Sequence, residues 1–249
     1  MGKNVMNRRI FTIMFTIASI LINCMCSYFA GLVAFPLYLD SLLTIAVTAL
    51  CGLIPGIACA IASNALLCIF ANTGVLFMLC HISTAVVAHL VFYSEREKTK
   101  TPLNPNTPYT DVSYTTENFM WIGFISAITN SILGDTISYL FYSANTSIPQ
   151  VDNAVQGIYV VTKSLKFAAY FGGTITNLID KVFSATVSLF VYRFIIQHKR
   201  LNVSGYKTKR ETVEEALKLL ITLKNQASIR NFRGKLLWDG DLEKMRLDK

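Results

Sequence analysis

The sequence predicts an all-α integral membrane protein, with a six-transmembrane-helix bundle followed by a small soluble helix and an extended C-terminal tail. The 249 residues are 53% apolar and only 15% charged, whereas soluble domains usually carry about 25% charged residues. The apolar residues gather in long runs before residue 200, and the residues after it contain no such run. The chain therefore divides into a membrane domain, 1–200, and a cytoplasmic tail, 201–249.

The predicted transmembrane helices follow the apolar runs, because about 20 apolar residues are needed to cross a bilayer. The second and third helices are short and meet at Gly52 and Pro55, which predicts a tight helical hairpin over 39–71. A further stretch, 153–171, carries two lysines among apolar residues and is either an interfacial helix or a partial span. The six helices are expected at 10–33, 39–53, 56–71, 75–94, 118–143 and 174–198.

Basic residues next to the apolar runs predict the orientation. The net charge of +8 is compatible with nucleic acid or an anionic surface as partner, but topology accounts for it better. With six spans the three basic clusters lie on one side, so both termini of this multi-pass protein are expected on the cytoplasmic side of the inner (cytoplasmic) membrane. The clusters are Lys3, Arg8 and Arg9; Arg96, Lys98 and Lys100; and Arg193, Lys199 and Arg200.

A few polar side chains lie inside the predicted helices, where they are expensive and tend to line sites or to pair internally. Spacings of three and four residues place Asn177 on one helix face with Asp180 and Lys181. These residues predict a polar pocket in the outward half of the bundle, and the alternative is a set of structural caps and internal pairs. The candidate substrate-binding residues are Asp40, Asn64, Asn130, Asp135, Asn177, Asp180 and Lys181.

Several kinds of chemistry are not supported. The six cysteines lie in apolar segments without a CxxC pair, which is typical of small buried thiols. His81 and His89 share a predicted helix, but their spacing leaves them about 80° apart around its axis, so they do not form a metal pair. The chain has no Ser/His/Asp set and no glycine-rich phosphate loop. We therefore expect no enzyme activity, no metal site and no cofactor.

A stripe of small and polar residues runs along the first predicted helix. Such stripes let helices approach closely in membranes. The stripe either packs within the protein or docks a separate membrane partner, and the sequence alone leaves both open. The candidate docking residues are Thr12, Thr16, Ser19 and Asn23.

Three segments carry a resemblance to a known family. The run Phe35-Pro-Leu-Tyr-Leu-Asp40, the run from Leu53-Ile-Pro-Gly56 to Asn64, and Leu178-Ile-Asp180-Lys181 resemble the substrate-binding S components of energy-coupling factor (ECF) transporters, over about residues 8–200. The resemblance implies a six-helix module that captures a vitamin or another small organic nutrient from outside. It also implies a membrane coupling subunit and two ATPases as partners. In that family small residues of the first helix dock the coupling subunit, often as Ala-x-x-x-Ala, whereas this stripe is Thr/Ser/Asn/Gly.

The tail contains one predicted helix. Thr208 and Glu211 form a capping box before an amphipathic run, which predicts a helix over 209–226 with one apolar face. A lone helix of this length is marginal in water, so its apolar face needs a partner. The polar residues 229–249, with spaced large apolar ones, are typical of an extended segment that orders on a partner.

The tail also resembles the C-terminal half of VapB-type antitoxins. The resemblance rests on the run from Gly205 to Leu217, on Arg233-Gly-Lys, and on Trp238-Asp-Gly-Asp-Leu-Glu-Lys-Met-Arg246. It implies that the tail binds a PIN-domain toxin, with Arg233, Trp238 and Arg246 as candidate toxin-binding residues. No room remains for the DNA-reading strand and first helix of such antitoxins, so DNA binding is not expected.

Three functions follow from these patterns. The first is an ECF-type substrate-binding subunit, which the polar residues inside the membrane favour because a plain anchor has no need of them. The second is a membrane-anchored regulator whose tail binds a PIN-domain toxin. The third is a membrane sensor, for which the sequence shows no transmitter domain.

Overall fold

The computed structural model describes residues 2–33, 37–99, 113–144, 146, 149–204 and 209–228. Every element in these ranges is helical and none is a strand, which confirms the all-α prediction. The chain forms two compact units, Met1–Ile195 and Ile196–Lys249. The helices are α1 (Gly2–Leu32), α2 (Thr44–Cys51), α3 (Leu53–Phe70), α4 (Met78–Thr99), α5 (Thr116–Asn130), α6 (Thr136–Phe141), α7 (Pro149–Thr162), α8 (Leu165–Ser204) and α9 (Lys209–Ser228).

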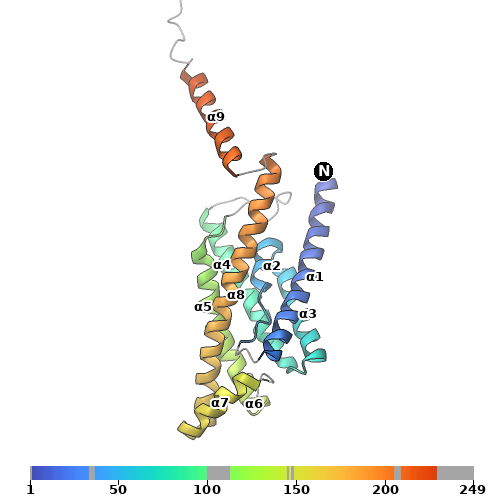
Figure 1. Cartoon of the computed structure of the whole chain (residues 1–249), viewed down its shortest axis with the longest axis vertical. Helices are drawn as coiled ribbons and strands as arrows, with labels where there is room; N and C mark the ends of the chain where they lie inside the picture. The colour runs from blue at the N-terminus through green and yellow to red at the C-terminus, as the bar shows by residue number, and fades with distance from the viewer. Residues whose placement is uncertain are drawn as a thin grey trace, which may run out of the picture. The chain divides into compact units, whose positions relative to one another are not determined.

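Three helical segments are long and apolar enough to cross a membrane. They are Arg9–Leu32 of α1, Leu53–Phe70, which is α3, and Val75–Lys98, which joins a short 3₁₀ turn to α4. Their number and length indicate a multi-pass membrane protein. Figure 1 shows that α1, α3 and α5 run in one direction through the first unit and that α4 and α8 run back.

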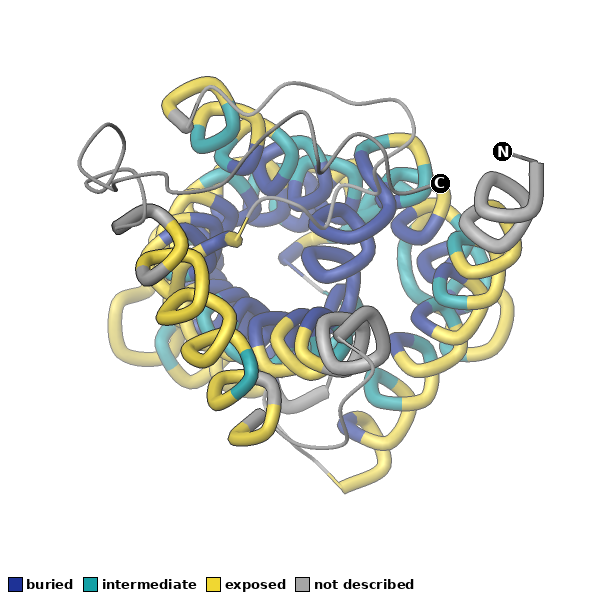
Figure 2. Tube along the Cα trace, turned by 90° about the horizontal axis from the view of Figure 1, so that it is seen from above, coloured by how far each residue is buried: buried dark blue, intermediate teal, exposed yellow. Residues whose placement is uncertain are grey.

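The first unit exposes many large apolar side chains and buries polar side chains among apolar ones. In Figure 2 the buried residues line the inner side of the ring of helices, and the exposed ones face outwards. The outward side chains include Met14, Ile69 and Phe190, each at least 65% exposed, whereas fully buried positions include Ser63 and Thr84. An apolar surface with polar side chains buried between the helices suits a lipid environment, where association depends on packing and hydrogen bonds between helices.

Helix α2 corrects the prediction of a helix over 39–53. It has 8 residues, all buried, and at a rise of 1.5 Å per residue it is about 12 Å long. Residues 37–43 before it are not helical. Non-helical backbone at membrane depth is tolerated only inside protein or beside a cavity, where other groups can satisfy it.

Side chains of α8 provide part of that support. Asp180 Oδ1 accepts a hydrogen bond from the backbone N–H of Leu39 at 2.8 Å. Ser188 Oγ accepts one from Ala46 N at 3.2 Å and donates one to the carbonyl of Leu42 at 2.7 Å. Two polar residues of one helix thus hold a segment about 140 residues away in sequence.

Helix α1 supports the same segment through the polar stripe that the sequence offers for partner docking. Thr16, Ser19 and Asn23 are buried on its inner face, and Thr12 is half-buried. Asn23 Oδ1 accepts a hydrogen bond from Leu43 N at 2.9 Å, and its Nδ2 donates to Thr44 Oγ1 at 3.2 Å. In this structure the stripe therefore packs within the protein, and the outer face of α1 is apolar.

The predicted hairpin turn between the second and third helices is present at Gly52. This residue has φ 99° and ψ −176°, a conformation essentially restricted to glycine. Helix α3 begins at Leu53, so Pro55 lies in its first turn, where a missing N–H costs nothing. A Cβ atom on Gly56 would overlap the Thr48 hydroxyl, so this glycine allows α2 and α3 to pack closely.

The predicted helix over 118–143 is interrupted. Helix α5 starts with a capping box between Thr115 and Asn118 and ends at Asn130. A π-helical turn, Ser131–Asp135, follows and leads into α6. Turns of this kind inside helices are rare and are often found at functional sites.

The stretch 153–171, left open as interfacial or partial span, belongs to two helices separated at Lys163 and Ser164. Helix α7 has 14 residues, about 21 Å of helix, which is too short for a hydrocarbon core of about 30 Å. Its Val155 packs with Ala168 and Ala169 of α8. The predicted last span, 174–198, is the middle of the 40-residue helix α8.

Aromatic rings close the end of the bundle at which α4 finishes and α5 begins. Phe92 lies 4.2 Å from Tyr114 and 5.2 Å from Phe119, between ring centroids. Tyr192 contacts both Tyr114 and Phe119, and its hydroxyl accepts a hydrogen bond from Tyr114 N. These contacts fill that end with apolar side chains.

The second unit contains α9, close to the predicted helix over 209–226. Val213, Leu217 and Leu220 on its apolar face are exposed. The capping residue Thr208 lies outside the described residues. So does the predicted extended segment 229–249, with all three candidate toxin-binding residues.

Candidate functional site

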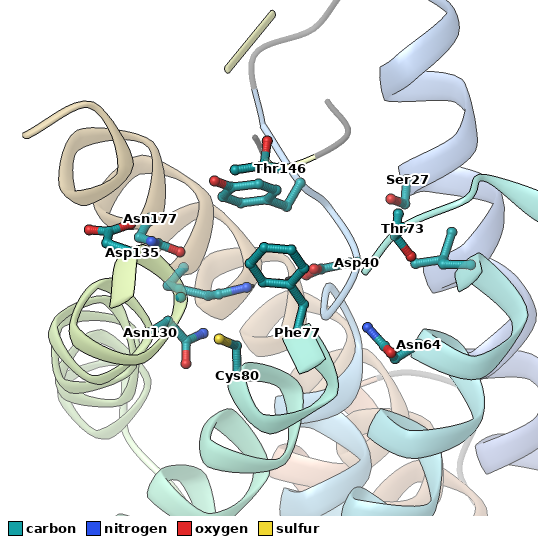
Figure 3. Close-up of a pocket in the computed structure, with 14 residues that line it drawn as sticks. Ser27, Asp40, Asn64, Thr73, Phe77, Cys80, Asn130, Asp135, Thr146 and Asn177 are labelled. Atoms are coloured by element: carbon teal, nitrogen blue, oxygen red, sulfur yellow. Dashed lines mark hydrogen bonds and ion pairs between the residues drawn. The ribbon is translucent and has the colours of Figure 1, made fainter. Parts of the chain in front are cut away.

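A pocket of about 610 Å³, counted with its open mouth, lies in the first unit at the end where α1 and α3 finish and α4 begins. Fourteen residues line it, from α1, α3, α4, α5, the π turn and α8 and from the segments between helices (Figure 3). Without the open mouth, the cavity volume is about 50 Å³.

Six of the seven candidate substrate-binding residues line this pocket, although they are spread over about 140 residues of sequence. The seventh, Asp180, is fully buried behind the wall, where its carboxylate bonds to Leu39 N and Lys181. The six are Asp40, Asn64, Asn130, Asp135, Asn177 and Lys181.

Lys181 stands at the centre of a buried charge network. Its Nζ lies 2.8 Å from Asp180 Oδ2, 3.2 Å from Asp40 Oδ1 and 2.7 Å from Ser41 Oγ. The contacts with Asp40 and Ser41 are hydrogen bonds, and the contact with Asp180 is an ion pair. The second oxygen of Asp40 lies 2.5 Å from His81 Nε2. The network pairs the Lys181 ammonium with two carboxylates of the protein itself.

The amide of Asn130 is also occupied by the protein. Its Oδ1 accepts from Ser83 Oγ at 2.5 Å, and its Nδ2 donates to Thr84 Oγ1 at 3.0 Å. Asn64 is different, since its Oδ1 accepts only a weak bond from Cys68 Sγ at 3.4 Å. The Nδ2 of Asn64 has no partner among the described residues, and in Figure 3 the side chain reaches into the pocket.

Asp135 and Asn177 are the least satisfied polar groups of the pocket. They are 4% and 6% exposed. Within the described part of the chain Asn177 has no hydrogen-bond partner, and Asp135 has only Thr174 Oγ1, at a long 3.4 Å. Buried polar groups normally have partners, so these two are available to a ligand.

The π turn and a glycine of α8 place these two side chains on one wall. The turn contains Asp135 and follows directly after Asn130, and both residues line the pocket. The Asp135 carboxylate lies so close to Gly173 that a Cβ atom there would overlap it. Since Gly173 lies one turn before Asn177 on the same face of α8, the carboxylate and the amide are neighbours.

Sequence reasoning did not find the aromatic side of the pocket. Tyr38 and Phe77 line it, and the Phe77 ring stacks on Tyr142 with centroids 5.4 Å apart. The remaining residues that the sequence did not single out are Ser27, Leu67, Thr73, Cys80, Gly134 and Thr146. Aromatic residues near helix ends are common in membrane proteins, so their presence alone carried no signal.

Among the described residues no group of three or more His, Cys, Asp or Glu side chains is arranged to hold a metal ion. No family model matches the chain, and neither the curated proteins nor the solved structures include a match to it. The fold and the site define a helical protein with the spans of a multi-pass membrane protein and a pocket that has polar and aromatic walls.

Proposed function

We propose that residues 1–200 form the membrane-embedded substrate-binding subunit of an ECF-type importer, which captures a vitamin or similar micronutrient for ATP-driven uptake. The observation that carries this proposal is the pocket, in which Asp135 and Asn177 are buried without adequate partners. A pocket with a few unpaired polar groups and an apolar wall is the usual form of a small-molecule site. The resemblance to S components over about 8–200 supports the same function.

The proposed topology has six crossings. The segment from α5 to α6 and the part of α8 in the first unit are about 39 Å and 46 Å long, enough to cross a core of about 30 Å. The charged residues Asp180 and Lys181 lower the mean hydropathy of α8. Lys181 lines the pocket, and Asp180 supports the non-helical segment beside it. Residues 37–51 make the remaining crossing, half as non-helical chain and half as α2.

The orientation of the pocket follows from the basic residues. Three arginines lie at the end of the bundle opposite the pocket. Arg9 is near the start of α1, Arg96 near the end of α4, and Arg193 in the later part of α8. The excess of basic residues marks the cytoplasmic side. The pocket then opens to the outside, and both termini are cytoplasmic.

Transport requires partners, because the chain carries no nucleotide-binding motif. We place the energy supply in two separate ATPases and a membrane coupling subunit. Because Ser19 and Asn23 are buried inside the bundle, the coupling subunit would contact the apolar outer face of α1.

Ligand binding by the full-length protein tests the function. The protein is purified in lipid nanodiscs, and native mass spectrometry is used to detect a retained small molecule. Asn177→Ala should reduce retention, whereas Ile179→Ala on the same helix should not, since its side chain is 54% exposed on the outer face. Uptake is then measured in cells supplied with coupling and ATPase subunits. Absence of any ligand together with absence of uptake refutes the proposal.

The tail supports a second candidate function, the binding of a PIN-domain toxin. The observation in its favour is the exposed apolar face of α9, around Val213, Leu217 and Leu220. A pull-down with the full-length protein tests it, with Arg246→Ala as the variant. Capture that is unchanged by Arg246→Ala removes the proposed role of that arginine.

A further inference from the structure

The charged groups in and behind the pocket wall do not balance. The lining residues and the network around Lys181 together contain three carboxylates, those of Asp40, Asp135 and Asp180, and one ammonium, that of Lys181. His81 contacts Asp40 and adds at most one positive charge. The set therefore carries a net negative charge with all three carboxylates ionised, whichever state His81 adopts.

The imbalance lies at Asp135. Lys181 and His81 both contact Asp40, and Lys181 also contacts Asp180. In the described residues Asp135 has no cationic neighbour within ion-pair distance, only the hydroxyl of Thr174. Burying an ionised carboxylate without a partner is costly, so this position favours an incoming positive charge or a proton.

Other walls of the pocket fit the same kind of ligand. The amide of Asn177 lies beside Asp135 and offers both an acceptor and a donor. Tyr38 and Phe77 provide aromatic surface, which attracts cations and stacks on flat rings. Among the described lining residues, an anionic ligand finds no unpaired cation, since Lys181 is already paired with Asp40 and Asp180.

We infer that the pocket binds a small organic cation, an amine or amidine attached to a flat ring, whose charged group pairs with Asp135 and Asn177. The ring lies against Tyr38 and Phe77. This inference rests on the proposed function, because it names the substrate class of the same site.

Three probes of nearly identical shape test the charge preference in the full-length protein in nanodiscs. Benzamidine is a cation, benzamide is neutral and benzoate is an anion. We expect benzamidine to bind at least about tenfold more tightly than benzamide, a difference of about 1.4 kcal/mol, and benzoate to show no binding. Binding is measured by isothermal titration at one pH and one salt concentration.

A substitution then tests whether Asp135 causes the preference for the cationic probe. Asp135→Asn should weaken benzamidine binding by about 30-fold or more, as expected for the loss of one partner of a buried charge pair, and leave benzamide binding unchanged. Glu117→Gln removes a negative charge at the opposite end of α5, where its carboxylate accepts a bond from Trp121, and should change neither. Because the probe series is measured on the unaltered protein, a misfolded variant does not decide the result.

Three outcomes overturn the inference: benzamide or benzoate binding as tightly as benzamidine, no binding by any probe, or benzamidine binding that survives Asp135→Asn. Different outcomes decide the proposed transport function. If the protein retains and imports a neutral or anionic nutrient, the substrate class is wrong and the transport function stands. If it retains no small molecule and supports no uptake, the function itself is wrong.

Discussion

Replacing Asn23 by Leu separates the two interpretations of the first-helix stripe. Asn23 is fully buried and supports the non-helical segment through Leu43 N and Thr44 Oγ1. Leucine has the same number and branching of side-chain heavy atoms, so the change removes the hydrogen bonds while keeping the branched shape. A buried N–H left without an acceptor costs about 1–3 kcal/mol, and loss of the second bond costs about 1 kcal/mol more. We expect Asn23→Leu to lower the free energy of unfolding by about 2–4 kcal/mol.

The assay is thermal unfolding of the isolated protein in detergent, with no partner present. For a chain of this size the loss corresponds to a fall in Tm of about 4–16 °C. Thr12→Val is the matched control, because Thr12 lies on the same helix, is half-buried and makes neither of these bonds. If Asn23→Leu changes Tm no more than Thr12→Val but abolishes binding of a coupling subunit, the stripe is a docking face and our reasoning is refuted.

Two further substitutions test the charge network and the pocket wall. Lys181→Met should lower the free energy of unfolding by about 3–5 kcal/mol in chemical denaturation, because it leaves the Asp40 and Asp180 carboxylates buried without their ammonium partner; a loss below about 1 kcal/mol contradicts the network. Gly173→Ala should weaken ligand retention measured by native mass spectrometry, because its Cβ displaces the Asp135 carboxylate. Gly157→Ala is the control, as it meets no atom within 4 Å, and equal retention by both variants contradicts the proposed wall.

The fold could be predicted where it depends on long apolar runs. α1, α3 and α4 lie close to their predicted ranges because length and hydropathy are local properties of the sequence. The unwinding of residues 37–43 was not predictable in this way. It depends on Asp180 and Ser188, which are about 140 residues away in the chain. The amino-acid composition does not predict the π turn either, because its residues fit an ordinary α-helix.

The candidate site was predictable in part, because polar side chains inside apolar helices are rare enough to be noticed. Their separate roles were not predictable. Lys181 and Asn130 have several protein partners, whereas Asn177 has none among the described residues. Sequence spacing shows that residues share a helix face, but only the tertiary structure shows which of them remain without partners.

The departures from regular helix in the first unit are concentrated at the end that holds the pocket. Among the described residues those with positive φ, other than glycine, are Leu39, Asn72, Ser143, Ala144 and Lys163, and all lie in the segments between helices at that end (Figure 1). Such conformations cost energy and persist only where surrounding contacts hold them, as at ligand sites. The opposite end is closed by tilted and edge-to-face aromatic rings. We therefore expect local opening beside the pocket, where breaking a few loop contacts leaves the long helices intact. This asymmetry agrees with the proposed function, in which the ligand enters from one side only.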